Sequence, residues 1–121
     1  MVVALVAAVT WIAWPAPAPT PIATRDLTIT APGGPGVDEP VELDSTLYLP
    51  AQTPAPAVIM AHGFGGSKRS VAADAEQMAR DGFVVLAYSA RGFGESTGQI
   101  ALDSLDYEIP DGRAADNSAA A

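Results

Sequence analysis

A glycine-rich loop around the only histidine of the chain holds the residues best suited to chemistry. The loop, His62-Gly63-Phe64-Gly65-Gly66-Ser67-Lys68, directly follows an apolar run at Ala57–Ala61. Ligands of α/β sheets bind beyond the carboxyl ends of the strands, so this position favours a functional site. Two phosphate-binding interpretations fail on spacing, because Walker A needs Ser or Thr where Arg69 stands and the dinucleotide fingerprint needs Gly where Lys68 stands.

The remaining functional interpretation of this loop is an oxyanion hole. Phe64 is the candidate donor of a backbone N–H to a developing negative charge, and His62, Gly63 and Gly65 are the candidates that support it. The alternative is an ordinary glycine-rich turn between a strand and a helix.

A second glycine-rich loop follows the apolar run Phe83–Tyr88. Its segment Gly94–Gly98 matches the Gly-x-Ser-x-Gly pattern of a nucleophile elbow. An elbow needs a strand that leads straight into the first glycine and a helix after the second, whereas Arg91–Phe93 intervene and the residues after Gly98 are weakly helical. We therefore predict a structural loop, in which Arg91 bonds backbone carbonyls or an acidic partner.

Composition excludes several kinds of site. With six Lys and Arg against fourteen Asp and Glu, the net charge is −8, which disfavours nucleic-acid binding. The chain has no cysteine, which excludes a thiol nucleophile, and its single histidine excludes a metal site built from several histidines. His62 adjoins the oxyanion loop and is not placed as the base of a Ser-His-Asp triad. No cofactor or metal is implied.

The hydrophobic pattern predicts an α/β fold. Ala57–Ala61 and Phe83–Tyr88 are unbroken apolar runs, typical of parallel strands covered on both faces. Between them, apolar residues at helical spacing predict a helix with Ser70 as its N-cap. The result is a βαβ unit.

Two further segments alternate between apolar and polar residues. Arg25–Ala31 and Val41–Leu49 flank a turn cluster of Pro and Gly, and together they predict an antiparallel hairpin at the edge of the sheet.

Taken together, these motifs resemble those of a known family. The segments LYLP, AVIMAHGFGGSK and FVVLAYSARGFGESTGQIALDSLDYE resemble the N-terminal part of an α/β-hydrolase, in the Xaa-Pro dipeptidyl-peptidase branch that also holds cocaine-esterase-like acyl hydrolases. The resemblance extends from Asp26 to Ile109. It implies that Phe64 donates an oxyanion N–H, that Arg91–Gly98 is structural, and that the triad would follow downstream in the order Ser, Asp or Glu, His.

The fold expected from this resemblance is a truncated α/β-hydrolase, with the hairpin and one βαβ unit but without the nucleophile strand and later elements. The expected function is that of an N-terminal fragment of a serine hydrolase of peptidase or esterase type, inactive alone, whose complete enzyme would take a peptide or ester substrate. The alternative is a small non-enzymatic exported or anchored protein that uses the glycine-rich loop as a ligand cradle.

The two ends of the chain differ from its body. Residues 1–14 are apolar and uncharged and predict an export signal or short anchor, the alternative being a core element, and residues 15–24 form a proline-rich linker. We expect an exported or membrane-anchored protein, with membrane contact only through residues 1–14 if they stay uncleaved, or a cytoplasmic one if this run is not a signal.

Residues 25–108 form the partial hydrolase domain. Residues 109–121 contain Pro110 and Gly112 and lack an apolar stripe, which predicts an aberrant or disordered tail, from a frameshift, a premature stop or a natural end.

Overall fold

The computed structural model describes residues 18–102 and 104–120. The prediction for residues 1–14 lies outside this part. Within the described part, no helix combines the length and the apolar character that crossing a membrane requires.

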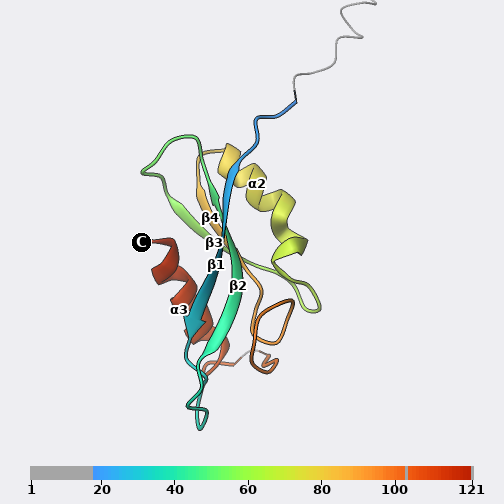
Figure 1. Ribbon diagram of the computed structural model, residues 1–121, viewed down its shortest axis with the longest axis vertical. Helices are drawn as coiled ribbons and strands as arrows, with labels where there is room; N and C mark the ends of the chain where they lie inside the picture. The colour runs from blue at the N-terminus through green and yellow to red at the C-terminus, as the bar shows by residue number, and fades with distance from the viewer. Residues whose placement is uncertain (1–17, 103, 121) are drawn as a thin grey trace, which may run out of the picture.

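A four-stranded sheet forms the centre of the fold, in the order β1-β2-β4-β3 (Figure 1). β1 (Ala23–Ala31) and β2 (Val41–Leu49) pair antiparallel, which confirms the predicted hairpin. β4 (Val84–Tyr88) pairs antiparallel with β2 on one side and parallel with β3 (Ala57–Ala61) on the other. The predicted parallel pair is thus confirmed, and β3 lies at the edge of the described sheet.

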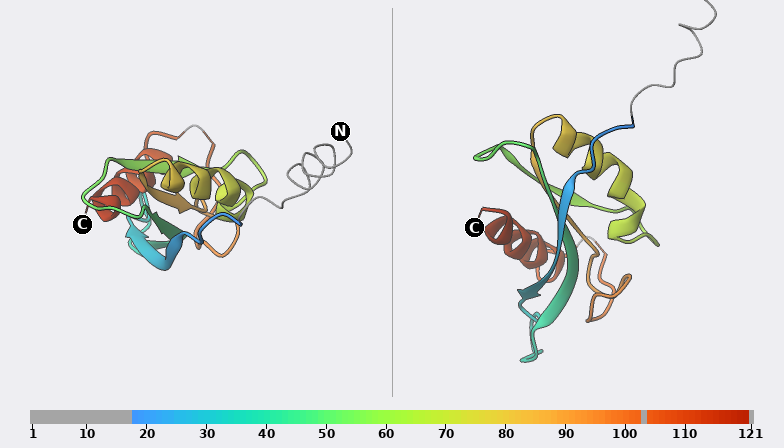
Figure 2. Two further views of the ribbon diagram at one scale, coloured as in Figure 1. Left: turned by 90° about the horizontal axis from the view of Figure 1, so that it is seen from above. Right: turned by 45° about the horizontal axis from the view of Figure 1, so that its top comes forward.

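Helices cover both faces of this sheet (Figure 2). A 3₁₀ turn, η1 (Lys68–Val71), leads into α2 (Ala72–Arg80), which packs Ala75 and Ala79 against Val85 and Ala87 of β4. On the opposite face α3 (Glu108–Ala119) packs Ala115 against Leu86 and Tyr88 of β4. The alternation along β4 gives each helix its own layer of the core.

The start of the connecting helix differs from the prediction. Ser70 is not the N-cap of α2, which begins after Val71 without a side-chain cap. Ser67 caps the preceding 3₁₀ turn, and its hydroxyl accepts the Arg69 N–H at 3.3 Å. The Ser70 hydroxyl instead accepts the Ser67 N–H at 3.1 Å, which closes a capping box. A 3₁₀ turn therefore precedes the α-helix, so that the polar start lies three residues earlier than the apolar stripe suggests.

The prediction of a disordered tail is wrong for the described residues after 108, which form α3. Pro110 is tolerated because it lies in the first turn, where a backbone N–H has no partner inside the helix. The apolar stripe is weak because one of the two buried residues of α3 is Asp111, whose partner Arg91 comes from another part of the chain. The Arg91–Asp111 ion pair therefore holds α3 against the rest of the fold, a role that buried apolar side chains usually have.

Candidate active site

The loop after β3 presents Phe64 at the tip of a tight turn. The Gly66 N–H donates to the Gly63 carbonyl at 3.0 Å, and Gly65 has a φ of 78°, which favours glycine. The Phe64 side chain is 77% exposed. Within residues 18–102 and 104–120, no hydrogen-bond acceptor lies on the Phe64 N–H. A backbone donor at the carboxyl end of a strand is therefore free to meet a ligand.

His62 ties this loop to the loop after β4. Its Nε2 accepts the Ala90 N–H at 3.0 Å, so Nε2 carries no proton. The proton must then be on Nδ1, which donates to the Gly63 carbonyl at 2.7 Å. Both ring nitrogens are therefore occupied by backbone groups.

Lys68 anchors the far end of the same loop to the hairpin. Its Nζ, on a side chain only 12% exposed, donates to Asp44 Oδ1 at 2.7 Å, to Asp26 Oδ1 at 3.2 Å and to the Ser45 carbonyl at 3.2 Å. Burial lowers the pKa of Lys68, but the hydrogen bonds to Asp44 and Asp26 outweigh it and raise the pKa above its ordinary value. Hydrogen bonds from Thr46 and Lys68 lower the pKa of Asp26.

The sequence alone does not reveal this cluster of Lys68, Asp26 and Asp44. From the sequence, Lys68 serves only to rule out a dinucleotide fingerprint. Its acidic partners lie 24 and 42 residues away along the chain, on two strands whose pairing had to be known first. The one available signal was the placement of Asp44 within a strand-like segment, where an acidic residue needs a partner if it is covered; the Asp26 side chain is 81% exposed and gives no such signal.

The loop after β4 is structural, as predicted. The Ser96 hydroxyl donates to the Ser89 carbonyl at 2.7 Å and accepts the Asp44 N–H at 2.8 Å. Turns and irregular backbone, rather than a strand and a helix, flank the Gly94–Gly98 segment. Ser96 therefore extends the hydrogen bonding of β2 and does not stand on an elbow.

Arg91 makes both kinds of contact that the sequence predicted. Its Nη1 and Nη2 donate to the carbonyls of Gly33 and Pro32, each at 2.9 Å. Its Nε and Nη2 form a two-point contact with the Asp111 carboxylate at 2.7 and 2.5 Å. The hydrogen bond to Asp111 raises the pKa of Arg91. Arg91 thus joins the hairpin turn, the β4 loop and α3.

In the described residues the His62 nitrogens contact only backbone atoms. The same residues contain no group of three or more His, Cys, Asp or Glu that could hold a metal ion.

Solved structures share this architecture. A hypothetical protein from Pseudomonas aeruginosa is 30% identical with a TM-score of 0.68, over 85% of this chain and 32% of that one. An esterase from Pyrococcus furiosus is 24% identical with a TM-score of 0.63, over 80% and 34%. Epoxide hydrolase A from Mycobacterium thermoresistibile is 20% identical with a TM-score of 0.59, over 82% and 29%. The fold is the N-terminal portion of an α/β-hydrolase, and the chain spans about a third of the length of these proteins.

Sequence similarity assigns the chain to one family within this fold. The profile of the X-Pro dipeptidyl-peptidase (S15) family matches residues 38–115, more than half of the chain, and the chain belongs to this family. A curated relative, the quorum-quenching protein AidA of Acinetobacter baumannii (strain MDR-ZJ06), is 38% identical over 61 residues, which are 49% of this chain and 20% of that protein.

Proposed function

We propose that this chain supplies the oxyanion loop of a serine hydrolase that cleaves peptide or ester bonds by acyl transfer to water. The Phe64 N–H donates to the negative oxygen that develops when the scissile carbonyl is attacked. The observation that carries the proposal is the unengaged Phe64 N–H at the carboxyl end of β3. A preorganised donor at that position stabilises the tetrahedral intermediate more than the planar carbonyl.

The surrounding contacts support a fixed donor. His62 bonds the loop to Ala90, and Lys68 bonds its far end to Asp44 and Asp26. An oxyanion donor works only if it is held in place before the reaction, since reorganisation would consume part of its stabilisation. Belonging to the X-Pro dipeptidyl-peptidase family and sharing the fold of an esterase agree with this role.

The 121-residue chain alone should not turn over substrate. A serine nucleophile needs a base within hydrogen-bond reach, and the only histidine of the chain is occupied by Ala90 and Gly63. We expect no hydrolysis of p-nitrophenyl esters or Xaa-Pro amides above background. Turnover that disappears in Ser96→Ala would contradict the proposal and make Gly94–Gly98 a nucleophile elbow after all.

A further inference from the structure

An aromatic pair lies beside the Phe64 N–H. The rings of Phe64 and Phe93 meet at right angles, with centroids 5.6 Å apart and an interplanar angle of 82°. Phe93 in turn meets the His62 ring, at 5.3 Å and 72°. Edge-to-face contacts at these distances are favourable. The exposed Phe64 ring therefore packs against a half-buried ring, which in turn packs against the histidine that fixes the loop.

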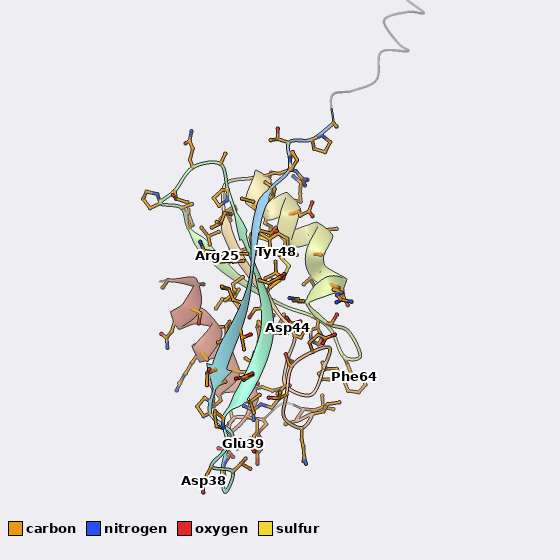
Figure 3. All side chains as sticks on the ribbon, in the orientation of Figure 1. Arg25, Asp38, Glu39, Asp44, Tyr48 and Phe64 are labelled. Carbon is orange, nitrogen blue, oxygen red and sulfur yellow. The ribbon has the colours of Figure 1, made fainter. Side chains whose placement is uncertain are left out.

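The backbone on either side of Phe64 faces open space. A Cβ added at Gly63 or Gly65 would meet no described atom within 4 Å, its own chain neighbours aside. Figure 3 shows the Phe64 side chain at the tip of its loop, beyond the sheet. A large apolar ring that is 77% exposed at the ligand-binding edge of an α/β sheet gives up the stabilisation of burial. It can regain that stabilisation only by contact with another molecule or another part of the complete protein.

From this geometry we infer that Phe64 and Phe93 form an aromatic wall that selects substrates with an aromatic group within a few bonds of the scissile carbonyl. The inference rests on the proposed function, because the oxygen bound at the Phe64 N–H fixes where the rest of the substrate lies. The N–H and the ring belong to one residue, so both lie at the same turn after β3. Edge-to-face contact favours an aryl group over a saturated ring of equal size.

The test measures carboxylate binding, since a carboxylate mimics the oxyanion without requiring turnover. Dilute ¹⁵N-labelled 121-residue chain is titrated with 3-phenylpropionate, 3-cyclohexylpropionate and acetate while the Phe64 amide resonance is followed. We expect all three to shift this resonance. We expect the phenyl compound to bind about twofold to tenfold more tightly than the cyclohexyl compound, the range that an aromatic pair contributes beyond its buried area.

Three variants assign the effect to the wall. Phe93→Leu and Phe64→Leu should both bring the phenyl preference close to one. Phe83→Leu is the matched control, because Phe83 packs with the α2 side of the core, and it should keep the preference. If Phe93→Leu loses its folded spectrum, the exposed Phe64→Leu decides.

The outcomes separate this inference from the proposed function. Equal binding of the phenyl and cyclohexyl compounds, or a preference that survives Phe64→Leu, overturns the aromatic wall while leaving the oxyanion donor intact. Shifts at the Phe93 amide, with no change at the Phe64 amide, contradict the oxyanion donor and keep an aromatic site. No response to any of the three compounds overturns both.

Discussion

Removing the Asp111 carboxylate should strongly destabilise the fold. Arg91 and Asp111 side chains are each 2% exposed, and Asp111 takes two of the four hydrogen bonds of Arg91. In Asp111→Ala the guanidinium stays buried without a carboxylate, and only the Gly33 and Pro32 carbonyls and the Tyr107 ring remain as its partners. Breaking a buried ion pair on one side costs about 3–5 kcal/mol. That is a large part of the roughly 5–15 kcal/mol that stabilises a typical domain.

Urea denaturation followed by far-UV circular dichroism measures this loss, together with a fall in Tm of about 12 °C or more. Glu76→Ala is the control, because it breaks the exposed Arg80–Glu76 pair on α2 and should cost only about 0.3–0.5 kcal/mol. The double variant Arg91→Met with Asp111→Leu should recover much of the loss, because it leaves no unpaired charge. If Asp111→Ala costs no more than Glu76→Ala, the ion pair does not hold α3 and the reasoning fails.

Three further predictions concern acid, the free edge and the first residues. Hydrogen bonds from Thr46 and Lys68 lower the folded-state pKa of Asp26, so its carboxylate stabilises the fold above its unfolded pKa of about 3.9 and loses that effect as the pH falls. The Tm of Asp26→Asn should therefore decline less between pH 5 and pH 2 than the Tm of the parent chain, and equal declines would contradict this. β3 has no charged residue and pairs on one side only within the described sheet, so Ala57→Lys should reduce concentration-dependent association in sedimentation velocity, and unchanged association would show that another surface is responsible. A reporter fused after Pro21 should leave the cytoplasm or sediment with membranes, whereas a soluble cytoplasmic reporter would contradict a signal or anchor in residues 1–14.

Local patterns predicted the sheet because each strand carries its own signal. Alternation in Arg25–Ala31 and Val41–Leu49 indicates a hairpin with one covered face, and the unbroken apolar runs indicate strands covered on both. Arg91 was predicted to bond carbonyls or an acid because a guanidinium next to a buried strand needs partners. The partners themselves could not be predicted, since Gly33 and Asp111 lie far from Arg91 along the chain.

The helix α3 shows where such patterns fail. Pro110, Gly112 and a weak apolar stripe all argue against a helix, and propensity alone favours disorder. Tertiary contacts override propensity here, because Asp111 and Ala115 are buried by docking against the sheet and Arg91. The Lys68 cluster escaped prediction for the same reason, as its partners come from two strands that only the fold brings together.

The central claim, that the Phe64 N–H is an oxyanion donor, is tested most directly by transplanting the loop. Residues 57–66 replace the corresponding segment of the Pyrococcus furiosus esterase, and ester hydrolysis is measured for the parent transplant, Phe64→Ala and Phe64→Pro. Proline removes the N–H, and the second position of a turn accepts its backbone geometry. We predict that Phe64→Ala keeps kcat within about tenfold, whereas Phe64→Pro lowers it by about 10²–10³, the cost of losing one oxyanion donor. Equal kcat values for Phe64→Ala and Phe64→Pro would contradict the claim.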